Sequence, residues 1–184
     1  MKAGIFYCHK SPRDSGKEQM DFKESIEQIQ RRLAESTPRK LQWPEFTPAA
    51  VLIPFLNRQG EPHVLLTMRT DTVEHHKGQI SFPGGAREPQ DRSLLETAIR
   101  ETEEELGIPG YCIHILGEAD DFPTITNFMV TPFACVVDPI PEYRPNQAEV
   151  AKVLEVPLDI FLTDRHFEIQ KRTYNGQTFP VFFY

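Results

Sequence analysis

The stretch from Ser93 to Gly107 carries the most complete helix signal in this chain of 184 residues. Ser93 is followed three residues later by Glu96, the pairing of a capping box, and Gly107 is the residue type that most often ends a helix. The positions between them form one broad apolar face: Leu94, Leu95, Ala98, Ile99, Thr102 and Leu106. An apolar face of this kind predicts a helix that packs on another layer of structure.

Acidic residues crowd the end of this predicted helix, in the segment 100–105. At 100° per residue, Glu101, Glu104 and Glu105 lie within one arc on the flank of the apolar face. Glu103 points elsewhere. These acids repel one another and lie at the negative end of the helix dipole, so a bound cation would offset both costs. Mg²⁺ prefers such carboxylate oxygens, whereas a solvated acidic surface is the alternative interpretation of the charges alone.

The overall charge limits the classes of partner. The chain has 27 acidic and 20 basic residues, a formal net charge of -7, whereas proteins that bind polyanions through bulk charge need a basic surface. We therefore expect neither nucleic acid nor a membrane as a partner. Cys8, Cys112 and Cys135 are too far apart in sequence to indicate a disulfide framework, which is typical of a cytoplasmic protein.

Upstream of the acidic helix, the pattern predicts a second helix and a β-hairpin. Residues 21–35 have apolar side chains at helical spacing, with Asp21 as the N-cap. The apolar run 49–55, the turn residues 57–60 and the strand-like segment 63–68 together predict the hairpin.

Downstream, the expected elements are strands at 112–116, 130–137 and 149–156, a short helix at 158–162 and a last apolar stretch at 179–184. Strands and a few helices in mixed order predict an α+β fold with a curved mixed sheet and helices on its faces. We divide the chain into an N-terminal extension with an amphipathic helix, residues 1–46, and one globular domain, residues 47–184.

A glycine pair precedes the acidic helix in the segment Phe82-Pro83-Gly84-Gly85. Residues 82–108 resemble the box of Nudix hydrolases, which reads Gly, five residues, Glu, seven residues, Arg-Glu, apolar, any, Glu-Glu, any, Gly, apolar. The second half matches position by position, with Thr102 at the apolar site. In the first half, Asp91 replaces the Glu that pairs with the Arg and stands one residue too early, and Glu88 is the alternative.

This one-residue insertion resembles the branch of Nudix enzymes that cleave coenzyme A. Its upstream signature, Leu-Leu-Thr-any-Arg-(Ser or Ala) followed by a second Arg, a Gly and Phe-Pro-Gly-Gly, is similar to residues 65–85. Thr70 replaces the small residue, which is a mild change. Glu74 stands where the second Arg is expected, so a charge that would bind phosphate is reversed. Further similarity extends over about residues 49–160.

The resemblance implies a Nudix-type α/β/α sandwich that holds Mg²⁺ or Mn²⁺. The implied metal ligands are the carboxylates of Glu101, Glu104 and Glu105 and the carbonyl of Gly84. A metal site of this kind lets an acidic protein bind a small anionic substrate.

The implied catalytic residues are Arg100, Glu101, Glu105 and Glu149. Arg100 would orient a glutamate of the cluster. The general base, which prepares water for attack, could be Glu105, Glu101 or Glu149.

The implied reaction is hydrolysis of a nucleoside diphosphate linked to another group, first of all coenzyme A to 3′,5′-ADP and 4′-phosphopantetheine. Arg69, His76 and Gly85 are the implied substrate contacts. The alternatives are a Nudix pyrophosphatase that acts on ADP-ribose, nucleotide sugars or nucleoside triphosphates, and a non-catalytic nucleotide-binding domain. The N-terminal helix could pack on its own domain or meet a second copy in a homodimer.

Overall fold

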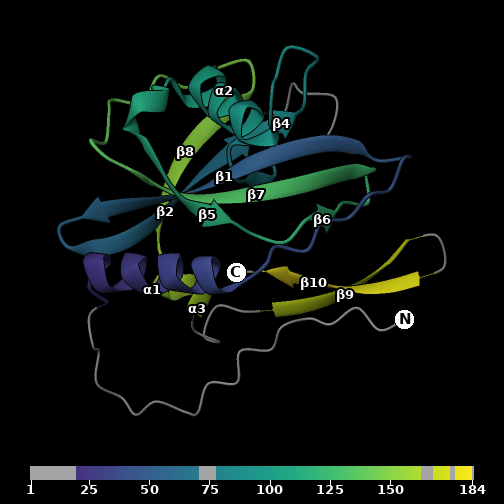
Figure 1. Ribbon diagram of the computed structural model, residues 1–184, viewed down its shortest axis with the longest axis horizontal. Coiled ribbons are helices and arrows are strands. Elements are labelled where there is room, and N and C mark those ends of the chain that lie inside the picture. Colours follow the sequence, from purple (N-terminus) through teal and green to yellow (C-terminus); the bar gives the residue numbers. More distant parts are fainter. Residues whose placement is uncertain (1–19, 71–77, 163–167, 175–176, 184) are drawn as a thin grey trace, which may run out of the picture.

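A mixed eight-stranded sheet between helices forms the centre of the molecule. The structure is a computed structural model that describes residues 20–70, 78–162, 168–174 and 177–183. Helix α2 covers one face of the sheet, and α1 and α3 lie on the other side (Figure 1). The expected α+β sandwich is therefore confirmed.

The elements follow one another in mixed order along the chain. They are α1 (Phe22–Glu35), β1 (Thr47–Arg58), β2 (Glu61–Arg69), β3 (Ile80–Ser81), β4 (Gly84–Ala86), α2 (Leu94–Leu106), the 3-10 helix η1 (Gly110–Cys112), β5 (Ile113–Glu118), β6 (Phe122–Pro123), β7 (Phe128–Val137), β8 (Val150–Pro157), α3 (Asp159–Leu162), β9 (Glu168–Tyr174) and β10 (Gln177–Phe183).

Strand β1 is the centre of the sheet, whose main path runs β3-β2-β1-β7-β5. It pairs antiparallel with β2 and β4 and parallel with β7. Strand β8 pairs with β2, and β6 pairs with β7. Strands β9 and β10 form a separate antiparallel pair. Because β4 pairs with β1 and β8 pairs with the neighbouring β2, the segments before α2 and before β8 are brought to one region.

The predicted hairpin is β1 and β2. Its turn places Gln59 at φ 56° and Gly60 at φ 89°, the left-handed pair that suits a two-residue hairpin turn. The Asn57 side chain accepts a hydrogen bond from the Gly60 N–H at 2.8 Å. The turn residues in the sequence therefore formed the turn that they predict.

Two apolar layers lie on the two faces of the sheet, because successive side chains of a strand point to opposite sides. Leu52 and Leu65 pack with Leu106 of α2 in the first layer. Phe55 and Leu66 belong to the second layer. The apolar stripe of α1 packs on that second layer through Phe22, Ile26, Ile29 and Leu33.

Both predicted helices begin at the predicted caps. Asp21 accepts a hydrogen bond from the Glu24 N–H at 3.0 Å, and Ser93 accepts one from the Glu96 N–H at 3.1 Å. Gly107 ends α2 at φ 67°, as a left-handed residue should. The capping box differs in one detail, because the Glu96 carboxylate accepts from the Arg92 N–H.

The sequence did not predict the short strands β3, β4 and β6, nor β9. Cys112 lies in η1, not in the strand expected at 112–116, which begins one residue later. None of the helices in the described residues is long and apolar enough to cross a bilayer.

Candidate active site

Arg100 is the hydrogen-bonding centre of the acidic end of α2. Its Nε and Nη2 each donate to one carboxylate oxygen of Asp91, both at 3.0 Å. Its Nη1 donates to Glu101 and to Glu104, both at 2.9 Å. One guanidinium group thus fixes three carboxylates, and its two-pronged contact with Asp91 is the strongest geometry for such a pair.

Asp91 is buried with 3% of its surface exposed and is fully hydrogen-bonded. Besides Arg100, the Glu88 N–H and the Thr97 hydroxyl donate to it, each at 2.9 Å. These donors, with Arg100 first, hold the pKa of Asp91 well below its usual range. The expectation that Asp91 pairs with Arg100 is confirmed, and the Glu88 alternative is wrong because the Glu88 side chain accepts from Gln90.

Thr97 is a partner of this ion pair that the sequence did not identify. It is fully buried on α2, and its hydroxyl donates to Asp91. A hydroxyl residue near the start of the helix, six residues after Asp91, is the signal that could have found it.

The two glycines of β4 bring the backbone close to its neighbours. Gly84 has φ 149°, and a Cβ added there would lie 2.2 Å from the Ala50 carbonyl oxygen. A Cβ added at Gly85 would lie 2.5 Å from the carboxylate carbon of Glu101. Glycine at both positions therefore lets β4 pair with β1 while the Glu101 carboxylate lies directly over the backbone.

Glu105 is almost as buried as Asp91, with 4% of its surface exposed. Its Oε2 accepts from the Gly84 N–H at 3.3 Å, and its Oε1 lies 3.9 Å from Arg69 Nη1. Burial raises the pKa of Glu105 to about 7, and Glu101 and Glu149 add to the rise, while Gly84 and Arg69 oppose it. Glu105 is thus a buried acid with weak electrostatic compensation.

Glu101 and Glu104 complete the cluster on α2. Burial raises the pKa of Glu101 against the opposing effect of Arg100, and the charges of Glu104 and Glu149 raise it further. The Glu104 side chain is 58% exposed. The three glutamates therefore extend from the buried Glu105 to the solvent, and each repels its neighbours.

Glu149 reaches this cluster from a different segment, the residue just before β8. Val150 is the pairing partner of Arg69 at the end of β2. The negative charge of Glu149 raises the pKa of both Glu101 and Glu105, so all three belong to one electrostatic cluster. The chain thus brings together the three acids considered as general base.

The Arg69 side chain lies beside Glu105, at the edge of the cluster. Its Nε is buried and has no hydrogen-bond partner among the described residues, while 31% of its side chain is exposed. A guanidinium that is partly exposed to solvent is suited to an anionic ligand, since it offers N–H groups to phosphate.

The donor set of the cluster fits a hard divalent cation. Arg100 and Gly84 each occupy one side of the glutamates, and no three His, Cys, Asp or Glu side chains of the described residues converge as a preformed metal cage. The remaining carboxylate oxygens are the ligand type that Mg²⁺ and Mn²⁺ prefer. Burial is the main cause of the raised pKa values of Glu101 and Glu105, and the neighbouring carboxylates add to it; a bound cation would lower both pKa values.

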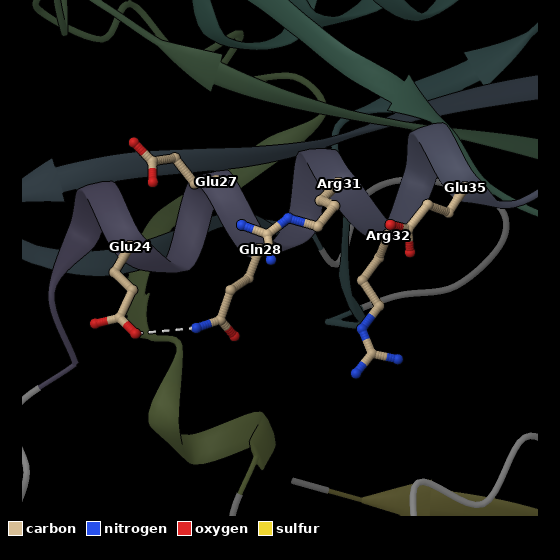
Figure 2. A pocket seen from close by; sticks show the side chains of 6 residues that line it. All are labelled: Glu24, Glu27, Gln28, Arg31, Arg32 and Glu35. Atoms are coloured by element: carbon tan, nitrogen blue, oxygen red, sulfur yellow. Dashed lines mark hydrogen bonds between the residues drawn. The ribbon is translucent and has the colours of Figure 1, made fainter.

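One surface hollow among the described residues lies elsewhere, along the outward side of α1. It has a volume of about 500 Å³ and is lined by Glu24, Glu27, Gln28, Arg31, Arg32 and Glu35 (Figure 2). These charges are mixed in sign, and α2 lies on the other face of the sheet. We assign this hollow no role.

His76, an implied substrate contact, and Glu74, the departure from the coenzyme A signature, lie outside the described residues.

The NUDIX domain family matches residues 46–176 of the chain. A protein of Yersinia enterocolitica named uncharacterized Nudix hydrolase NudL is 46% identical over 110 residues, 60% of this chain and 56% of the relative. Its namesake from Photorhabdus laumondii is 38% identical over 136 residues, 74% of this chain and 72% of the relative. The chain thus spans little more than half the length of the Yersinia relative.

Solved structures show the same fold at lower identity. A NUDIX hydrolase from Alicyclobacillus acidocaldarius has a TM-score of 0.54 and 22% identity, and covers 67% of this chain and 84% of its own. The Nudix hydrolase RenU from M. smegmatis has a TM-score of 0.53 and 22% identity, covering 66% of this chain and 76% of its own.

Proposed function

We propose, on the premise that the chain belongs to the NUDIX domain family, that it is a divalent-metal-dependent pyrophosphatase. The observation that carries this proposal is the pairing of a buried Glu105, whose pKa is raised to about 7, with the repelling carboxylates of Glu101 and Glu104. A protein gains nothing in stability from such a cluster, whereas a cation site requires it.

Glu101, Glu104 and Glu105, with the carbonyl of Gly84, would hold Mg²⁺ or Mn²⁺. When bound, such an ion neutralises the diphosphate charge and lowers the pKa of a bound water. Arg100 keeps the carboxylates of Glu101 and Glu104 oriented through its Nη1. Asp91 in turn keeps Arg100 in place.

We assign the general base to Glu149. Arg100 donates to Glu101 and the Gly84 N–H donates to Glu105, which supports a ligand role for these two acids. Glu149 belongs to a different segment, immediately before β8. Its carboxylate takes the proton of the attacking water, the water oxygen bonds to phosphorus, and the bond from that phosphorus to the bridging oxygen breaks.

The preferred substrate in this proposal is coenzyme A, cleaved to 3′,5′-ADP and 4′-phosphopantetheine. The partly exposed guanidinium of Arg69 beside Glu105 supports a phosphate contact, and Gly85 is proposed as a further substrate contact. His76 is proposed as a further phosphate contact. The second candidate is a pyrophosphatase for ADP-ribose or nucleotide sugars, which Glu74 favours because it reverses a charge in the coenzyme A signature.

A substrate panel tests this choice. Coenzyme A, ADP-ribose, a diadenosine polyphosphate and a nucleotide sugar are each incubated with the protein and Mg²⁺ or Mn²⁺, and the products are separated by chromatography. We expect kcat/KM for coenzyme A to exceed the others by at least about tenfold, a difference of about 1.4 kcal/mol. Equal values for ADP-ribose and coenzyme A would remove the coenzyme A assignment. Binding without hydrolysis of any compound would favour a non-catalytic domain.

A further inference from the structure

The turn that delivers Glu149 is organised by Asn146. The carbonyl of Asn146 accepts from the N–H groups of Glu149 and Val150, at 2.9 Å and 2.8 Å. Its side-chain oxygen accepts from the Ala148 N–H at 3.1 Å. Its own N–H donates to the carbonyl of Glu105 at 2.9 Å. The turn is therefore attached to the end of α2, at the same residue that carries the buried acid.

Thr70 holds the opposite side of this turn, from the residue just after β2. Its N–H donates to the Glu149 carbonyl at 2.9 Å. Its hydroxyl donates to the Ala148 carbonyl, also at 2.9 Å, across 78 residues of sequence. The backbone and the side chain of Thr70 thus bind two consecutive carbonyls of the turn, those of Ala148 and Glu149. We call this pair of hydrogen bonds the clamp.

The contacts of Thr70 fix the turn to the sheet, beside the acidic end of α2. Glu149 raises the pKa of both Glu101 and Glu105, so it stands close enough to be repelled by them. A surface turn held only by its own hydrogen bonds could relax away from that repulsion. Thr70 ties the turn to β2, whose last residue, Arg69, pairs with Val150. Thr70 therefore fixes the backbone of the turn at Glu149 itself and at the residue before it.

We infer that Thr70 is a positioning residue, whose hydroxyl keeps the Glu149 carboxylate in its working place. The inference rests on the proposed function, because it requires that Glu149 acts in the reaction. It also gives a role to the position at which this chain departs from the Ser or Ala of the coenzyme A signature. Serine would keep the hydroxyl donor at this position, whereas alanine would lose it.

The test uses the substitutions Thr70→Val and Thr70→Ser in the full chain. Thr70→Val replaces the hydroxyl by a methyl group of similar size, so we expect kcat to fall about 10- to 100-fold, since small misplacement of a reacting group has effects of this order. KM should stay within about twofold, because Glu149 acts on the water and not on substrate binding. Thr70→Ser should restore most of kcat.

The matched control is Ser36→Ala, which also removes one hydroxyl that donates to a backbone carbonyl. That hydroxyl donates to the Leu33 carbonyl at 3.0 Å, at the end of α1. We expect its kcat to equal that of the unaltered protein. A similar fall in both variants would indicate general loosening and would overturn the positioning role.

A double-mutant cycle separates this inference from the proposed function. In a Glu149→Gln background, Thr70→Val should have no further effect on kcat, because the group that it positions is already disabled. Additive effects, or a Thr70→Val variant with full kcat, overturn the inference while the base assignment stands. If Glu149→Gln itself keeps full kcat, the base assignment fails, and the inference falls with it.

Hydrogen exchange tests the clamp independently, because it needs neither substrate nor metal. Hydrogen exchange of the Glu149 and Val150 amides should be faster in Thr70→Val, while Tm changes by no more than about 2 °C. Unchanged exchange at these two amides would overturn the clamp. Ser36→Ala should leave both amides unchanged.

Discussion

Asp91 and Glu105 are two equally buried acids at opposite ends of α2, yet their pKa values move in opposite directions. Asp91 is 3% exposed and its pKa is lowered, whereas Glu105 is 4% exposed and its pKa is raised to about 7. Asp91 accepts hydrogen bonds from two N–H groups of Arg100, from one backbone N–H and from one hydroxyl. Glu105 has one backbone N–H at 3.3 Å and a distant Arg69.

The difference shows that burial alone does not decide the state of a carboxylate. At the Asp91 end, the protein itself supplies every donor, and the site is complete after folding. At the Glu105 end, the acidic side chains of the cluster outnumber the arginines that contact them. In the function proposed above, the first end contributes to stability and the second binds a cation from solution. Each prediction below tests one side of this contrast.

The largest expected effect is on activity. Glu105→Gln keeps the shape of the side chain and its hydrogen bond from Gly84 but removes the charge, so metal-dependent hydrolysis should fall by two to four orders of magnitude, roughly 3–5 kcal/mol. Steady-state rates with Mg²⁺ measure it. Glu103→Gln is the control, because Glu103 is exposed, and its rate should stay within about twofold. Equal losses in both variants would contradict a localised site.

The next largest effect is on the thermal stability of the protein, through Asp91 at the start of α2. Asp91→Asn leaves the Arg100 guanidinium without its buried counter-charge, so Tm should fall by roughly 10 °C. Thermal unfolding followed by circular dichroism measures it. The loss should disappear in acid, because a lowered pKa gives stability that is present above the unfolded value and lost as pH falls through the folded value. An Asp91→Asn protein as stable as the original would refute the structural role.

The third prediction concerns the pH dependence of stability at Glu105, which has the opposite sign to that at Asp91. The raised pKa of Glu105 means that its contribution to stability is present below about 4.5 and is lost as pH rises through about 7. Without metal, the free energy of unfolding should therefore drop by about 1–3 kcal/mol between pH 5 and pH 8 in the unaltered protein. Glu105→Gln should lack this part of the drop. Denaturant unfolding in EDTA at several pH values compares the two.

The smallest expected effect is the stability of Glu104→Gln. Its side chain is 58% exposed, so the lost contact with Arg100 and the lost repulsion nearly cancel. Tm should be unchanged or slightly raised, within about 2 °C, while hydrolysis falls by orders of magnitude. A large loss of Tm would place Glu104 with Asp91 on the structural side.

The sequence predicted those parts of the fold whose signals are local. The caps at Asp21 and Ser93, the stop at Gly107 and the hairpin turn all depend on contacts within a few residues. The pairing of Asp91 with Arg100 followed from the family resemblance. These features were confirmed because local hydrogen bonds and apolar spacing do not depend on distant partners.

The remaining features depend on distant partners. Strands β3, β4 and β6 have two or three residues each and exist only through pairing with neighbours. The clamp from Thr70 joins segments 78 residues apart, so spacing along the chain carries no sign of it. The raised pKa of Glu105 arises from burial by the whole fold. The division at residues 46 and 47 and the homodimer stay predictions.

A direct titration with Mn²⁺ tests the central claim that the acidic C-terminal end of α2 binds a divalent cation. Calorimetry at pH 8 compares the unaltered protein with Glu105→Gln and Glu103→Gln. We expect saturable Mn²⁺ binding in the unaltered protein and in Glu103→Gln, and affinity at least about tenfold weaker in Glu105→Gln, a difference of about 1.4 kcal/mol. Equal binding in all three proteins, or no binding in any, would contradict the account.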